Sequence, residues 1–130
     1  MKYLLDTNVV IGLSKGISRL EERVHQQDPA DVGLSVIVLH ELYFGAYKGQ
    51  RVAANLEAIA DLKFDVVNFD KEDARHAGQI RAELTARGRP IGPYDILLAG
   101  QAISKNLTLI THNTREFSRV HGLHIEDWEA

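Results

Sequence analysis

The side chains best suited to chemistry in this chain are four acids set in otherwise apolar or turn-forming sequence: Asp6, Glu41, Asp95 and Glu116. Asp6 ends an apolar run that predicts a short buried strand, and Asp95 lies just inside a helix that begins at Gly92-Pro93. Glu41 lies within a predicted helix, and Glu116 follows a predicted strand. Carboxylates that converge at the ends of strands and helices form the kind of site that a hard divalent cation binds.

Three of these acids also have a plain structural interpretation when each is taken alone. Asp6 could end its strand and cap the next helix, because Asp-Thr-Asn is favourable capping sequence. Asp95 in a first helical turn would gain about 0.3–1 kcal/mol from the helix dipole. Glu116 could be a solvated loop residue. The set is therefore a stronger indication of a site than any one member, because clustered carboxylates repel unless a cation or protons are bound.

Glu41 has an unusual setting, because its neighbours one helical turn away are mainly apolar. Both stripes of the helix are apolar, which predicts that the helix is largely buried. A buried carboxylate has to be paired, protonated or bound to a metal ion. An ion pair with an arginine and a place in a metal site are both open interpretations.

The acids are positioned by a pattern of short strands that alternate with helices. Strands are predicted over residues 2–5, 32–34, 65–69, 107–111 and 124–126. Helices are predicted over 8–14 (capped by Thr7), 18–27, 36–47 (capped by Ser35), 51–62, 71–87 (capped by Asp70), 93–105 and 114–118. This alternation indicates a three-layer α/β/α sandwich with a short, mainly parallel sheet. Ligands bind beyond the carboxyl ends of the strands in such sheets, where Asp6 and the loop after residue 111 would lie.

Length and composition are those of one globular domain over residues 1–130. The chain contains no cysteine, which excludes disulfides, thiol catalysis and cysteine-ligated metal sites. There is no recognisable targeting segment and no apolar stretch of membrane-spanning length, so a cytoplasmic location is expected.

The charge is distributed unevenly, although the net charge is only −3. Residues 75–119 contain seven basic and three acidic residues, and Asp95 and Glu116 are two of those three acids. A local basic rim is compatible with a polyanionic substrate, whereas the alternative is a set of solvated helix faces. The candidates for contacts with a nucleic-acid backbone are Arg81, Arg87, Arg89 and Arg115.

Four segments in this order resemble a known family. They are Met1-Lys2-Tyr3-Leu4-Leu5-Asp6-Thr7-Asn8, His40-Glu41-Leu42-Tyr43-Phe44-Gly45, Ile91-Gly92-Pro93-Tyr94-Asp95 and Thr111-His112-Asn113-Thr114-Arg115-Glu116-Phe117. The chain resembles a VapC-type PIN-domain toxin over its full length. The resemblance implies a Mg²⁺-dependent endoribonuclease, with Mn²⁺ as a possible substitute, that is the toxin of a type II toxin–antitoxin pair. It further implies a small VapB-type antitoxin as partner, a homodimer, and transfer RNA as the substrate.

The same resemblance suggests roles for individual residues. Asp6 and Asp95 are similar to the principal metal ligands of the family, and Glu41 to a further acid that binds metal directly or through water. The fourth position of the family is often aspartate, whereas here it is Glu116, which is one methylene longer. Thr111 and Asn113 are similar to the polar residues that hold this loop beside the site.

Two other functions remain as alternatives. A metal-dependent phosphatase of the haloacid-dehalogenase kind also starts from an aspartate after the first strand, but it needs a second aspartate two residues later, where this chain has Asn8. A non-catalytic PIN-like module that binds RNA or protein would not need the complete acidic set.

Overall fold

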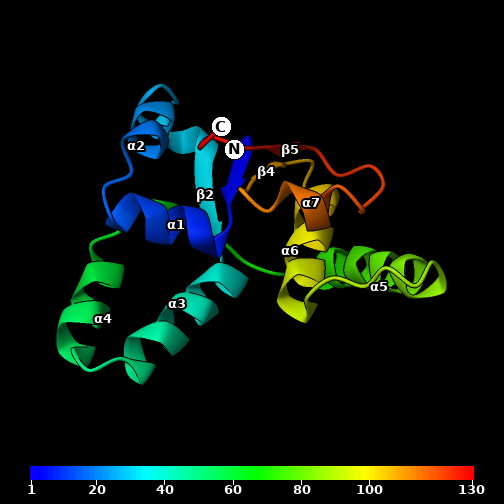
Figure 1. Ribbon diagram of the computed structural model, residues 1–130, viewed down its shortest axis with the longest axis horizontal. Coiled ribbons are helices and arrows are strands. Elements are labelled where there is room, and N and C mark those ends of the chain that lie inside the picture. The colour runs from blue at the N-terminus through cyan, green and yellow to red at the C-terminus, as the bar shows by residue number, and fades with distance from the viewer.

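The structure is a computed structural model that describes residues 1–130, and a parallel sheet lies at its centre (Figure 1). Its elements follow one another along the chain as β1 (Tyr3–Leu5), α1 (Thr7–Ser14), α2 (Ser18–His25), a 3₁₀ turn (Pro29–Asp31), β2 (Val32–Ser35), α3 (Val36–Lys48), α4 (Val52–Ala60), β3 (Asp65–Val67), α5 (Lys71–Ala86), α6 (Pro93–Ser104), β4 (Thr108–Ile110), α7 (Thr114–Phe117) and β5 (Ile125–Glu126).

The strand order places the chemistry-bearing segments side by side. The order is β3-β2-β1-β4-β5, and every neighbouring pair is parallel. Leu5 at the end of β1 is in register with Ile110 at the end of β4. The residues that follow these two strands, Asp6 and Thr111, therefore leave the sheet next to each other. This is the three-layer α/β/α sandwich predicted from the sequence, with a sheet that is entirely parallel.

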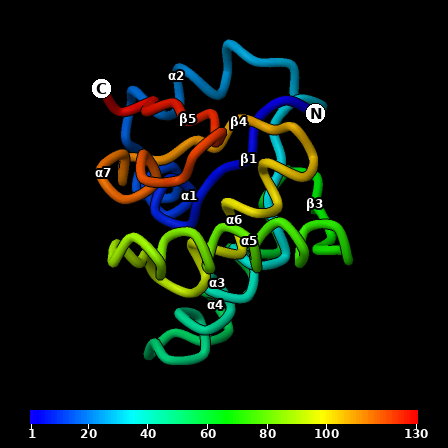
Figure 2. Tube along the Cα trace, turned by 90° about the vertical axis from the view of Figure 1, so that its right-hand side faces the viewer, coloured from blue at the N-terminus to red at the C-terminus, as the bar shows by residue number.

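Helices α5 and α6 lie side by side, and the hairpin of α3 and α4 projects beyond the sheet (Figures 1 and 2). The close approach of α5 and α6 depends on Gly100, because a Cβ atom there would lie only 2.6–2.7 Å from the backbone and Cβ of Ala77. The first turn of α5 is fixed by a capping box in which Asp70 and Asp73 each accept a hydrogen bond from the other's backbone N–H. Lys105, just after α6, forms ion pairs of 2.8 Å with Asp70 and 3.2 Å with the fully buried Asp73. The helix that carries Asp95 is thereby tied to α5 at its far end.

The predicted elements are all present, but several details differ. Asp6 caps α1 by accepting a hydrogen bond from the Val9 N–H, so the assignment of Thr7 as the cap was wrong. The 3₁₀ turn was not predicted. Helix α3 is much less buried than its apolar sequence indicated, since Phe44 and Tyr47 are 63% and 65% exposed. The cause is that α3 packs mainly on α4 in the projecting hairpin rather than under the sheet.

A membrane-spanning helix is absent, because none of the helices combines the length and the apolar character that crossing a bilayer requires.

Candidate metal centre

Asp6 is the most firmly held of the four acids. Its backbone N–H donates to the Ile110 carbonyl, which continues the pairing of β1 with β4. Its side chain is buried, with 6% exposure, and each carboxylate oxygen accepts one hydrogen bond. The Val9 N–H donates to Oδ1 at 2.9 Å, and the Thr111 hydroxyl donates to Oδ2 at 2.5 Å. A carboxylate oxygen has two acceptor positions, so both oxygens of this oriented side chain retain capacity for a cation.

Asp95 and Glu41 are brought together by a contact between the residues that precede them. The rings of Tyr94 and His40 lie 5.0 Å apart, and this contact joins the start of α6 to the middle of α3. Pro93 occupies the first helical position of α6, so Asp95 lies in the first turn. No group of the chain donates a hydrogen bond to the carboxylate of Asp95 or Glu41. Unlike Asp6, these two acids have both oxygens available.

Glu116 is linked to Asp6 through the loop that leaves β4. The Asn113 N–H donates to the Thr111 hydroxyl oxygen at 3.0 Å, and the Asn113 side-chain amide donates to Glu116 Oε2 at 3.1 Å. Together with the Thr111–Asp6 bond, these contacts form an unbroken network from the first acid to the fourth. Thr111 is fully buried, and it fixes the loop by donating to one residue and accepting from another.

Asp95 lies near enough to the other three acids for their charges to affect its pKa. Burial raises the pKa of Asp95 from 3.8 to about 6, and the charges of Glu116, Glu41 and Asp6 contribute to this increase in that order. Burial also raises the pKa of Asp6, against the lowering effect of its hydrogen bonds with Thr111 and Val9. The charge of Glu41 adds to the increase at Asp6. Charge effects of this kind place the carboxylates in one neighbourhood, although the ligand atoms of no three of them lie within 4.8 Å of one another.

The donor set suits a hard cation. None of the ion pairs in the structure involves any of the four acids, so the interpretation of Glu41 as an arginine ion pair does not hold. Carboxylate oxygens without a basic partner are the preferred ligands of Mg²⁺, which binds one or two carboxylates and retains several waters. The residues present therefore fit a hard divalent cation, which these carboxylates would hold together with water.

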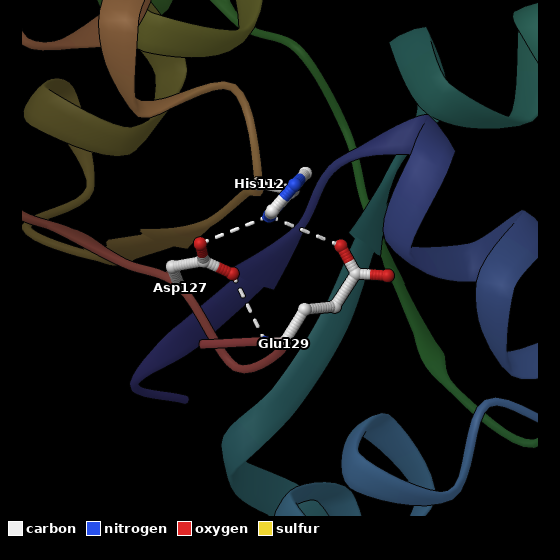
Figure 3. Close-up of side chains that lie close together, drawn as sticks. All are labelled: His112, Asp127 and Glu129. Atoms are coloured by element: carbon white, nitrogen blue, oxygen red, sulfur yellow. Dashed lines mark hydrogen bonds and ion pairs between the residues drawn. The ribbon is translucent and has the colours of Figure 1, made fainter.

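A second cluster, shown in Figure 3, was not predicted. His112 Nδ1 is 2.9 Å from Asp127 Oδ2 and 3.2 Å from Glu129 Oε2, and the ligand atoms of the three residues all lie within 4.8 Å of one another. The hydrogen bond with Asp127 raises the pKa of the exposed His112, and the charge of Glu129 adds to this effect. The cluster joins the β4 loop to the chain end after β5. Histidine spacing alone could not reveal it, because the partners are acids brought in by the tertiary fold.

The basic residues of the segment 75–119 divide into paired and unpaired ones. Arg75 pairs with Glu72 at 3.2 Å, and Lys105 pairs with two aspartates, so these two basic side chains are opposed by acids. Arg81 lines a groove of about 580 Å³ between α5 and the start of α6. The other three predicted contacts gather in a separate hollow of about 260 Å³ and are Arg87, Arg89 and Arg115.

Comparison with known proteins gives consistent results from sequence and structure. A family model described as the PIN domain matches residues 3–123. The chain is 42% identical to the tRNA(fMet)-specific endonuclease VapC of Shigella flexneri, with 98% of each chain covered. It is 36% identical to Ribonuclease VapC2 of Haemophilus influenzae, again with 98% of each chain covered.

Among solved structures, the chain is similar to one in the DNA-bound VapBC of Salmonella typhimurium, with a TM-score of 0.93, 40% identity and 98% of each chain covered. The likeness extends over nearly the whole fold. This chain belongs to the VapC-type ribonucleases of the PIN-domain family.

Proposed function

We propose that this protein is the toxin of a type II toxin–antitoxin pair and cleaves RNA in a Mg²⁺-dependent reaction at the centre formed by Asp6, Glu41, Asp95 and Glu116. The observation that supports the proposal is the hydrogen-bonded network that fixes Asp6 and links it through Thr111 and Asn113 to Glu116, in a set of four acids that have no basic partner. The raised pKa of Asp95, which results from burial and from the charges of the other three acids, agrees with this arrangement. Folding places four like charges together at a cost, and a bound divalent cation offsets that cost. Mn²⁺ has similar ligand preferences and is expected to substitute.

We assign a distinct task to each acid from its place in the fold. Asp6 and Asp95 would hold the cation, one from the end of β1 and the other from the first turn of α6. When bound, a divalent cation activates water and neutralises charge on the phosphate. Glu41 has no hydrogen-bond partner in the chain, so its carboxylate is free to orient the attacking water and accept its proton. Glu116 is held by Asn113, and it would help to hold a second cation that stabilises the leaving oxygen if two sites fill. In-line attack by water leaves a 5′-phosphate and a 3′-hydroxyl.

The substrate class follows from the relatives and the charge distribution. The Shigella relative is named as a tRNA(fMet)-specific endonuclease, and the basic hollow near the acids suits a polyanion. We therefore propose transfer RNA as the substrate of this chain.

The test is cleavage of transfer RNA by the purified chain in Mg²⁺, in EDTA, and by the Asp6→Asn variant in Mg²⁺. Asn keeps the size of the side chain and its contact with the Val9 N–H, so the fold should survive while cleavage falls by at least about a hundredfold. The product ends should be 5′-phosphate and 3′-hydroxyl. Undiminished cleavage in EDTA with 2′,3′-cyclic phosphate ends would show that the reaction is not metal-dependent hydrolysis.

The partners are proposed on separate grounds. A VapB-type antitoxin is proposed because the similar Salmonella structure is a VapBC complex. The exposed Phe44 and Tyr47 on the projecting α3–α4 hairpin supply an apolar surface of the sort that such a partner covers. An arginine of the antitoxin could enter the carboxylate cluster and inhibit it. Homodimerisation is proposed from the family alone, and light scattering on the purified chain tests it directly.

A further inference from the structure

A hollow of about 260 Å³ on the surface is lined by cationic and polar side chains without any hydrophobic or acidic residue. We call it the arginine hollow, and its lining residues are Arg87, Arg89, Arg115, Ser118, Arg119 and His121. Arginine rather than lysine supplies all the permanent charge. The planar guanidinium donates two parallel hydrogen bonds, a geometry that matches carboxylates and phosphates.

Two segments far apart in sequence build the arginine hollow. Arg87 and Arg89 flank Gly88, whose φ of +65° ends α5 in a tight turn. Arg115 and Arg119 come from α7 and the turn after it. The Arg87 side chain donates to the Arg119 carbonyl at 2.6 Å, and the Arg119 side chain donates to the Pro90 carbonyl at 3.1 Å. These crossed bonds hold the two segments together, so the hollow is a built feature of the fold.

The charge in the arginine hollow is unusual because no acid compensates it. None of the four arginines takes part in an ion pair, in contrast to Arg75 on the same helix as Arg87. The helix dipole at the C-terminus of α5 stabilises the positive charge of Arg87. The Arg119 side chain uses one of its donors in the hydrogen bond to the Pro90 carbonyl. Nothing in the chain pairs with the side chains of Arg89 and Arg115. In addition, the Nε of Arg119 is shielded from solvent and has no hydrogen-bond partner. The hollow thus presents donors for an anion that the chain itself does not supply.

The arginine hollow lies next to the carboxylate centre. Arg115 immediately precedes Glu116 on α7, and Arg119 binds the carbonyl of Pro90 in the loop that leads into Asp95. The hollow and the carboxylate centre therefore share α7 and the loop before α6.

We propose that the arginine hollow binds a backbone phosphate of the RNA substrate close to, but not at, the bond that is cut. The proposal rests on the RNA cleavage proposed above and extends it to a phosphate subsite that includes Arg119. The hollow has no aromatic platform for a base, so it would contribute affinity and register without reading sequence.

The test is the binding of a short transfer-RNA fragment to the full chain in EDTA, measured by fluorescence anisotropy over a range of salt concentrations. The double variant Arg89→Gln/Arg115→Gln removes two charges that make no hydrogen bond within the chain, so its thermal unfolding should match that of the wild type. We expect its Kd to rise about tenfold or more. The slope of log Kd against log salt should fall by about 0.7 for each phosphate that the variant no longer neutralises. Arg75→Gln is the matched control, because it removes an exposed arginine of α5 that is paired with Glu72, and it should change neither quantity.

Two further measurements separate this proposal from others. Arg89→Lys/Arg115→Lys should keep the salt slope while losing part of the affinity, because the charge remains without the planar fork. In Mg²⁺, the Gln double variant should raise KM and keep the single-turnover cleavage rate at saturating RNA within about twofold.

The proposal is overturned if the wild type cleaves RNA and the Gln double variant binds it with unchanged Kd and salt slope. It is also overturned if the double variant loses only its binding to a VapB-type antitoxin, in which case the hollow serves an acidic protein segment. Failure of the wild type to cleave any RNA would instead refute the proposed function.

Discussion

Replacing Asp95 with asparagine should stabilise the metal-free protein even though it removes a proposed metal ligand. The pKa of Asp95 is raised from 3.8 to about 6, so the folded state disfavours the charged form. Each pKa unit corresponds to about 1.4 kcal/mol, which sets an upper limit of about 3 kcal/mol at neutral pH. The side chain is only partly buried, and solvent screening reduces this to about 1–2 kcal/mol.

The sign of the pH dependence follows from the direction of the shift. A carboxyl group whose folded pKa lies above its unfolded value makes the protein less stable as pH rises from about 4 to about 6. The advantage of Asp95→Asn should therefore be present at pH 7.5 and largely absent near pH 4. At about 2.1 cal/mol/K per residue, a gain of about 1–2 kcal/mol corresponds to an increase in Tm of about 4–7 °C at pH 7.5 in EDTA.

The assay is thermal unfolding of the wild type and Asp95→Asn in EDTA at both pH values, and then in Mg²⁺. Because the cation binds the folded state, Mg²⁺ should raise the Tm of the wild type and have little effect on the variant. Glu21→Gln is the matched control, since Glu21 lies in the first turn of α2 and is exposed without an ion pair. It should leave Tm unchanged or slightly lower. An Asp95→Asn variant that is no more stable than the wild type at pH 7.5 would refute the repulsion on which the reasoning depends.

Three other predictions concern the elements around the centre. Gly100→Ala should destabilise the protein by about 1–3 kcal/mol in urea unfolding, because its methyl group would collide with α5. Gly78→Ala, at a position of α5 with open space around it, should instead stabilise the protein by about 0.4–1 kcal/mol. Equal effects of the two substitutions would contradict the close packing of α5 and α6. Lys105→Met should lower the free energy of unfolding by about 1–3 kcal/mol in the same assay, because it leaves the fully buried Asp73 without its counter-charge. An unchanged free energy of unfolding would show that this ion pair does not contribute to stability. In NMR titrations, the pKa of His112 should lie above 6.5 and should fall in Asp127→Asn, and failure to fall would exclude the hydrogen bond as its cause.

The positions of Asp6 and Asp95 could be inferred from the sequence because they depend on local rules. An acid after an apolar strand lies at the carboxyl edge of a parallel sheet, and an acid after Gly-Pro lies in a first helical turn. The strand pattern likewise predicted the fold class. The environment of Glu41 could not be inferred, because the apolar residues of α3 are partly exposed on a projecting hairpin rather than covered by the sheet.

Features that depend on long-range contacts had no sequence signal. The cluster of His112 with Asp127 and Glu129 requires the chain end to fold back beside β4. The pairing of Lys105 with the first turn of α5 depends on how two helices pack. The turn after α5 also meets α7, and this contact gathers three of the four predicted arginines in one hollow. Arg81 lies apart from them in another groove.

Diffraction from crystals soaked in Mn²⁺, with anomalous difference maps calculated at the manganese edge, locates the bound cation directly. We expect a peak coordinated by oxygens of Asp6 and Asp95, with Glu41 as a direct ligand or one water away, and loss of that peak in crystals of Asp6→Asn. A peak found only between His112, Asp127 and Glu129, or no peak on the protein at all, would contradict it.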